Sequence, residues 1–111
     1  MAIHHAKSGE VIDVRPLGEA LTKTITHTII KTDQLEVIRI VLPAGNELPT
    51  HQVPGEITVQ CVEGRVNFMI GQTARELTAG AMLYVEGGSE HSLRASEDSS
   101  LLVTILLKNR A

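Results

Sequence analysis

Short stretches of alternating apolar and polar residues, separated by turn residues, dominate this chain. Repeated period-two alternation with many β-branched residues predicts strands. The clearest stretches are 22–32 (TKTITHTIIKT), 35–42 (LEVIRIVL), 65–70 (RVNFMI), 73–77 (TAREL) and 100–108 (SLLVTILLK). No stretch has a convincing helical period with caps, so the pattern predicts an all-β sandwich or small barrel.

The N-terminal third has a weaker pattern. Glu10–Val14 (EVIDV) alternates as a short strand would, whereas Arg15–Leu21 is interrupted by proline and glycine and predicts a turn or a single helical turn. We expect residues 1–34 to form N-terminal strands and a turn that pack on the barrel or on a partner subunit. Residues 35–111 are expected to form the barrel itself.

Two segments repeat one arrangement of glycine corners, apolar residues and a single histidine. They are Gly45–Gly64 (GNELPTHQVPGEITVQCVEG), which carries His51, and Gly80–Ala95 (GAMLYVEGGSEHSLRA), which carries His91. Glycine corners of this kind aim side chains into the interior of a β-barrel. We therefore expect the two imidazoles to face each other across the hollow of the barrel. They are candidates for ligand contact or acid-base chemistry, since histidine titrates near neutral pH.

The spacing of these residues resembles the two sequence motifs of the cupin superfamily. The positions that match the motifs are Gly45, His51 and Gly64 in the first, and Gly80, Gly88 and His91 in the second. The resemblance implies a single-domain, RmlC-like double-stranded β-helix, that is, a cupin jelly-roll barrel. Small cupins also commonly form homodimers.

The chain departs from the cupin motifs at two of the four metal-ligand positions. Val53 stands where the second histidine is expected and Ile57 where the glutamate is expected. Of the four residues that usually hold the cupin metal, only His51 and His91 remain. Two imidazoles alone hold a divalent metal weakly, because protein sites normally supply three or more ligands.

Other residues of the same segment are candidates for a third ligand. Strict alternation from His51 puts Glu56 and Gln60 on the opposite face, but a bulge at the Pro54-Gly55 dipeptide would reverse the faces. One hypothesis is therefore a site for Fe, Mn, Ni or Zn made by His51, His91 and Gln60 or Glu56. The alternative is a metal-free pocket in which two neutral histidines hydrogen-bond a ligand, or each other through water.

Further side chains are predicted to line the pocket. They are Glu56, Cys61, Met69, Tyr84 and Arg39. Arg39 is either an anchor for an anionic substrate inside the barrel or an arginine that reaches the sheet edge and pairs with Glu36. Cys61 has no neighbouring cation in the sequence, so we interpret it as a small core hydrophobe rather than an activated thiolate.

Composition narrows the function classes. The chain has 111 residues, a net charge of −3 and one cysteine, which excludes an intrachain disulfide and a cysteine-rich zinc site. Basic and aromatic residues are too sparse for a nucleic-acid surface, and no apolar run is long enough for a membrane span or a signal peptide. These features favour a cytoplasmic protein.

Two functions follow from the resemblance and remain open. One is a small-molecule enzyme, such as a metal-dependent oxygenase or an isomerase, that uses His51 and His91 as ligands or acid-base groups. The other is a non-catalytic binding or sensory cupin without metal. In either case the closing stretch 100–108 is more apolar than one buried face requires, which predicts a homodimer.

Overall fold

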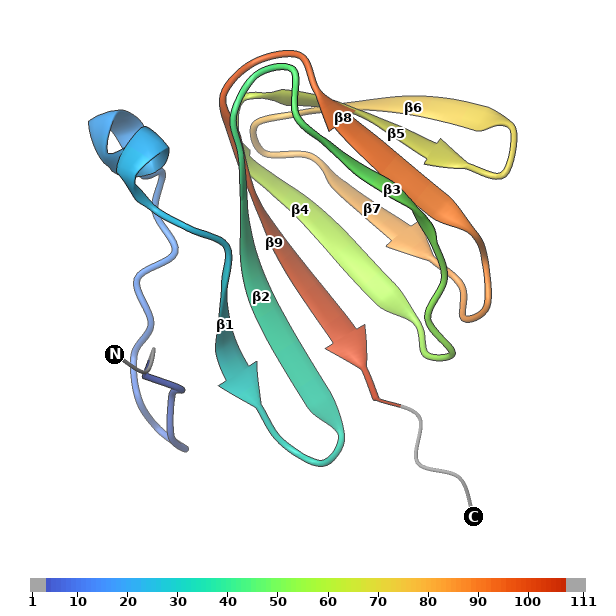
Figure 1. The fold of residues 1–111 in the computed structure, drawn as a ribbon. Coiled ribbons are helices and arrows are strands. Elements are labelled where there is room, and N and C mark those ends of the chain that lie inside the picture. The colour runs from blue at the N-terminus through green and yellow to red at the C-terminus, as the bar shows by residue number, and fades with distance from the viewer. Residues whose placement is uncertain (1–3, 108–111) are drawn as a thin grey trace.

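The computed structural model describes residues 4–107 and shows two antiparallel β-sheets packed face to face (Figure 1). The larger sheet has the order β1-β2-β9-β4-β7 and the smaller one β3-β8-β5-β6. The strands are β1 (His27–Lys31), β2 (Leu35–Leu42), β3 (Glu47–His51), β4 (Ile57–Glu63), β5 (Arg65–Ile70), β6 (Thr73–Thr78), β7 (Met82–Val85), β8 (His91–Ala95) and β9 (Ser99–Leu106). The predicted all-β cupin jelly-roll is confirmed.

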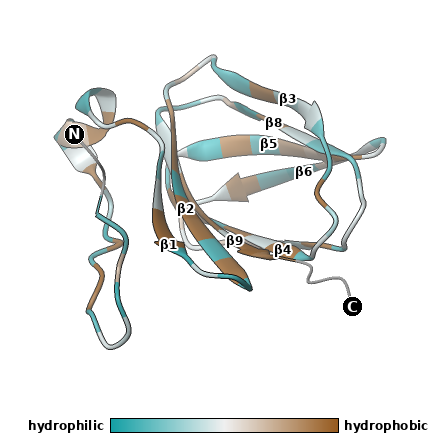
Figure 2. Ribbon diagram, turned by 60° about the horizontal axis from the view of Figure 1, so that its bottom comes forward, coloured by the Kyte–Doolittle hydropathy of each residue, from teal (hydrophilic) through white to brown (hydrophobic). Residues whose placement is uncertain are grey.

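The hydrophobic core lies between the two sheets. In β4 the alternation puts Ile57, Val59 and Cys61 inside, where they pack against inward side chains of the facing sheet such as Val66 and Phe68. Successive side chains of a strand point to opposite faces, so one face of each strand builds this core. In Figure 2, β2 is mostly hydrophobic with short hydrophilic interruptions. The predicted hairpin of residues 65–70 and 73–77 is also present.

Two glycines allow corners of the barrel to approach β9 closely. Gly64, between β4 and β5, has φ +90°, and a Cβ there would lie 2.2 Å from Ser99 Oγ. A Cβ on Gly55 would lie only 1.7 Å from the carbonyl oxygen of Leu106. Both positions therefore require glycine, one for its conformation and space and the other for space alone.

The N-terminal region differs from the sequence-based prediction. Glu10–Val14 forms no strand, and of residues 22–32 only His27–Lys31 belongs to β1. The residues before β1 wind into the 3₁₀-helix η1 (Gly18–Lys23). A strand requires a ladder of partners, and residues 4–17, called the N-terminal arm from here on, make one backbone hydrogen bond to β1, from Ala6 N to Ile29 O.

The N-terminal arm and η1 lie beside β1, at one side of the barrel (Figures 1 and 2). β1 pairs with β2 in the larger sheet, so the predicted division between residues 34 and 35 falls just after a turn within one hairpin. Lys108, the last residue of the predicted closing strand, lies outside the described residues. Within residues 4–107, no helix has the length and apolar character that a membrane span needs.

Candidate functional site

His51 and His91 are brought together by the pairing of β3 with β8. The two residues are direct cross-strand partners, and their ring centroids lie 4.3 Å apart with an interplanar angle of 63°. The expectation that they face each other across the barrel is wrong, because they occupy neighbouring strands of one sheet. A directly opposed pair in an antiparallel sheet brings side chains into contact on the same face.

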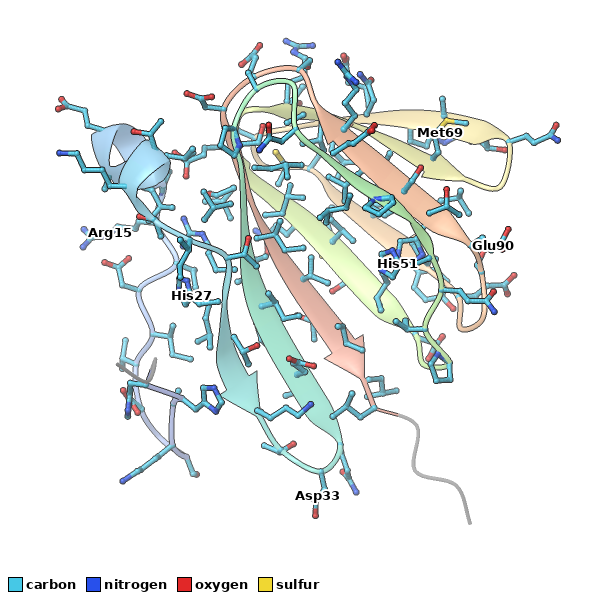
Figure 3. All side chains as sticks on the ribbon, viewed as in Figure 1. Arg15, His27, Asp33, His51, Met69 and Glu90 are labelled. Carbon is cyan, nitrogen blue, oxygen red and sulfur yellow. The ribbon has the colours of Figure 1, made fainter. Side chains whose placement is uncertain are left out.

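A bulge in β3 turns His51 inward. Leu48 pairs with Leu93 and His51 with His91, so three steps along β3 match two steps along β8. The extra residue keeps both Leu48 and His51 on the inner face, although strict alternation would separate them. The predicted bulge at Pro54-Gly55 is instead found earlier in the chain, within β3. Figure 3 shows the His51 side chain directed toward the space between the sheets.

His91 is the buried member of the pair. The residue is 4% exposed, and its ring stacks on Phe68 with centroids 5.6 Å apart and an interplanar angle of 13°. Burial lowers the pKa of His91, and the proximity of His51 lowers it further, while the hydrogen bond to Ser89 acts in the opposite direction. His91 is therefore neutral at pH 7.

Backbone carbonyl groups fix both imidazole rings in the same tautomer. Nδ1 of His51 lies 3.2 Å from Pro49 O, and Nδ1 of His91 lies 3.0 Å from Ser89 O. A carbonyl oxygen only accepts hydrogen bonds, so each Nδ1 carries the proton. In its neutral form, a ring with the proton on Nδ1 keeps a lone pair on Nε2 as a hydrogen-bond acceptor.

The two histidines line an otherwise apolar cavity of about 90 Å³ between the sheets. Ten of its lining residues are aliphatic or aromatic: Ile38, Ile40, Leu48, Val53, Ile57, Val59, Phe68, Leu93, Val103 and Ile105. His51 is solvent-exposed whereas His91 is buried. The cavity thus combines an apolar lining with two adjacent acceptor nitrogens, one near solvent and one deep.

Several predicted site residues lie outside the barrel. Gln60 is exposed and pairs with Met82 and Leu102 on the outer face of the larger sheet. Glu56 accepts a hydrogen bond from the hydroxyl of Tyr84, which is itself 57% exposed. No bulge occurs between Pro54-Gly55 and β4 that would turn these residues inward, so the predicted third ligand does not reach the histidines.

The remaining predicted pocket residues also lie away from the cavity. Met69 is 37% exposed on the outer face of β5 (Figure 3). Arg39 is buried, but its side chain leaves β2 on the outer face, toward the N-terminal arm. Cys61 does point inward and is fully buried, in the core rather than at the cavity. Burial raises the pKa of the Cys61 thiol, which agrees with the interpretation as an inert hydrophobe.

Sequence reasoning missed the apolar residues that shape the cavity. Phe68 is the clearest case, since its ring supports His91 from the neighbouring strand. One signal was available: Phe68 is the single phenylalanine of the chain and lies in a strand whose alternation puts it inside. Leu48 had no such signal, because the bulge beside it was not predicted.

The donor set does not fit a resident divalent metal. Within residues 4–107, no group of three or more His, Cys, Asp or Glu side chains is placed to hold a metal ion. The histidine Nε2 atoms are the atoms of the cavity that could ligate a metal, and its other side chains are apolar. Two imidazoles fall short of the three or more ligands that such metals take from proteins.

The fold and this cavity define a small β-barrel protein with an internal, mostly apolar cavity. The cupin-domain family model matches residues 38–106, and the chain belongs to the cupin family. No curated protein matches the chain. The cupin motif positions that were matched from the sequence all lie within the matched range.

Solved structures similar to this chain carry the same fold. A conserved protein of unknown function from Streptococcus pyogenes is 21% identical, with a TM-score of 0.76, and the match covers 99% of this chain and 97% of that one. A cupin superfamily protein from Desulfitobacterium hafniense is 13% identical, with a TM-score of 0.77, covering 93% and 100%. An RmlC-like cupin from Desulfovibrio desulfuricans is 25% identical, with a TM-score of 0.69, covering 92% and 97%.

Proposed function

We propose that this cupin binds a small molecule with an apolar body and one hydrogen-bond donor group, and that it does so without a resident metal. The observation that carries the proposal is the pair of Nε2 lone pairs, of His51 and His91, in a cavity whose other lining residues are apolar. Because both nitrogens accept, the ligand must donate. A hydroxyl group or a neutral N–H group meets this requirement, whereas a carboxylate does not.

The size of the cavity limits the ligand. An engineered apolar cavity of about 150 Å³ in another protein holds benzene. The cavity of about 90 Å³ therefore fits an apolar body of only a few carbon atoms. A larger ligand would extend past His51, which is exposed.

The proposal predicts discrimination between donors and acceptors. A ligand without a donor leaves the acceptor nitrogen of the buried His91 unpaired, which costs about 1–3 kcal/mol. Such a ligand should bind roughly 10- to 100-fold more weakly than a donor of equal size. A pair of probes with the same carbon skeleton, 2-butanol and 2-butanone, separates hydrogen-bond donation from apolar burial.

The test is a titration of ¹⁵N-labelled protein at pH 7.5 that follows the histidine Nε2 resonances. We expect 2-butanol to shift the resonances of His51 and His91 in a saturable way, with 2-butanone at least about 10-fold weaker. His91→Ala should abolish the response, while His27→Ala, which removes a histidine of the outer face, should leave it unchanged. Equal binding of both probes, or binding that survives His91→Ala, would contradict the proposal.

An isomerase that transfers a proton is a second candidate function. It is favoured by the contrast between an exposed His51 and a buried His91 in contact, since two adjacent titratable groups in different environments suit acid-base roles. One imidazole would take a proton from a carbon beside a carbonyl group, and the resulting imidazolium would return it to another atom of the same molecule. Incorporation of deuterium from D₂O into 2-butanone, faster with the wild type than with His91→Ala, would support this reaction. An equal rate with both would exclude it for this probe.

A further inference from the structure

A second polar centre lies outside the barrel, where the N-terminal arm covers β2. Arg39 is 3% exposed there, and its Nη2 donates hydrogen bonds to Arg15 O at 2.6 Å and to Ser100 Oγ at 3.1 Å. The same nitrogen lies 3.6 Å from Glu63 Oε2. A buried cation thus links the arm, β2 and β9 at one point.

The hydrogen bonds of Arg39 are incomplete. Among residues 4–107 they all come from Nη2, and the buried Nε–H group has no partner. An unpartnered buried N–H group costs about 1–3 kcal/mol, and a charged one costs more. Native proteins rarely leave such a donor without an acceptor, so this N–H group is available to a water molecule or to a ligand from outside the chain.

Two pockets border the Arg39 side chain, with volumes of about 430 Å³ and about 340 Å³. They share Asp13, Leu17 and Arg39 and together run along the inner side of the N-terminal arm. The second pocket also has aliphatic lining from Ile12 and Ile29. Figure 3 marks the region, with Arg15 on the arm and His27 on β1 beside it.

The acidic residues of these pockets are already occupied. Asp13 accepts hydrogen bonds from the backbone and guanidinium of Arg15, and these hold the pKa of Asp13 far below its usual range. Glu10 accepts from Lys7 N and His4, which lowers its pKa too. Both are therefore anions with partners of their own, and the unpaired donor of the region is that of Arg39.

We propose that this region is a second binding site, specific for a small carboxylate with a short apolar tail. The carboxylate would accept from the remaining N–H groups of Arg39, since charge-assisted hydrogen bonds between guanidinium and carboxylate are the strong ones. The tail would lie against Leu17 and Ile29. The two sites of the protein then have opposite requirements: the barrel site accepts hydrogen bonds, and the site under the arm donates them.

The probe for this site is butanoate, titrated at pH 7.5 into ¹⁵N-labelled full-length protein. The readout is the Nε–Hε cross-peak of Arg39, assigned by its loss in Arg39→Lys. We expect butanoate to shift this cross-peak in a saturable way, acetate to bind several-fold more weakly, and the neutral butanamide at least about 10-fold more weakly. An unchanged cross-peak, or equal shifts with inorganic phosphate, would overturn the carboxylate assignment.

The location of the site can be tested with substitutions that leave Arg39 and its hydrogen-bond partners unchanged. Ala6→Phe places a large side chain in the second pocket and should weaken butanoate binding at least about 10-fold, whereas Ala20→Phe in η1, outside both pockets, should not. Butanoate binding unaffected by Ala6→Phe would overturn the proposed location. His91→Ala should leave butanoate binding unchanged, so the two proposals can fail separately.

Discussion

The imidazole of His51 meets that of His91 edge to face, with ring centroids 4.3 Å apart, because the two residues are paired across β3 and β8. Each ring is also held at Nδ1 by a carbonyl oxygen two residues earlier in the chain, Pro49 O in β3 for His51 and Ser89 O just before β8 for His91. The pair is therefore positioned by backbone pairing and backbone hydrogen bonds, and no carboxylate among residues 4–107 is bonded to either ring. The proposed ligand would therefore meet a pair of side chains that is already held in place.

The burial of His91 predicts a pH dependence of stability. Its folded-state pKa is lowered, mainly by burial, below the value of about 6.5 expected for the unfolded chain. As the pH falls through about 6.5, the unfolded chain takes up a proton that folded His91 does not, so the free energy of unfolding decreases. The decrease stops once the pH is below the folded pKa. Urea unfolding at pH 7.5, 6.5 and 5.5 measures this loss.

The matched variant for this experiment is His91→Gln, which keeps a polar side chain but cannot titrate. Over the same pH range its stability should fall less than that of the wild type. Glu10, Asp13 and Glu63 do not disturb the comparison, because their pKa values are lowered and their contributions are lost at lower pH, equally in both proteins. Parallel pH profiles of the two proteins would mean that His91 is not the group responsible.

Substitution of Glu63 should lower the free energy of unfolding more than substitution of an exposed glutamate. Burial alone would raise its pKa, but hydrogen bonds from Ser100, Leu17 and Gly18, together with the charge of Arg39, lower it. We expect Glu63→Gln to cost about 2 kcal/mol, less than the 3–5 kcal/mol for breaking a fully buried pair, because its side chain is 16% exposed. Amides of Leu17 and Gly18 should also exchange faster with deuterium.

The control for Glu63→Gln is Glu97→Gln. Glu97 pairs with Arg65, and their side chains are 58% and 43% exposed. An exposed pair contributes at most about 1 kcal/mol, so this variant should unfold close to the wild type in urea. Equal losses in both variants would show that Arg39 and Glu63 form no more than an ordinary surface pair.

A substitution at Gly55 tests how closely the corner before β4 packs on β9. A Cβ there would overlap Leu106 O at 1.7 Å, and both groups are held by the backbone, so Gly55→Ala should cost about 3 kcal/mol or more in urea unfolding. Gly80→Ala is the comparison, since Gly80 has φ +93° but open space around it, and should cost about 1–2 kcal/mol. The reverse order of the two costs would argue against this packing.

The sequence was sufficient for the fold and for the meeting of two histidines, because glycine corners and alternation are local properties. It was not sufficient to predict which side chains point into the cavity. Leu48 and His51 share the inner face only because β3 contains a bulge. One extra residue in a strand reverses the face to which every later side chain points. The same reason explains the error at Gln60. Its predicted position beside the histidines required a bulge at Pro54-Gly55, and that bulge does not occur.

Arg39 was misplaced for a different physical reason. In the run LEVIRIVL, Arg39 is the one charge of the apolar second half, and it was predicted either to line the pocket or to pair with Glu36 at the sheet edge. In the structure both faces of β2 are covered, the inner one by the core and the outer one by the N-terminal arm. A nearly continuous apolar run is typical of strands buried on both faces, and this signal was present in the sequence. The arm that covers it lacks a regular pattern, which made its position unpredictable.

The outer face of the larger sheet leads to the last prediction, a homodimer. Met82 and Tyr84 are 67% and 57% exposed on β7, and Leu102 adjoins them across β4. We expect light scattering after size exclusion to give twice the chain mass of 12.0 kDa, and Met82→Asp to shift the protein toward monomer, because a charge in an apolar interface is costly. Met69→Asp, on the other sheet, places the same charge at an exposed methionine and should leave the dimer intact. A wild-type mass of 12.0 kDa would contradict the dimer, and an equal effect of both substitutions would contradict this choice of face.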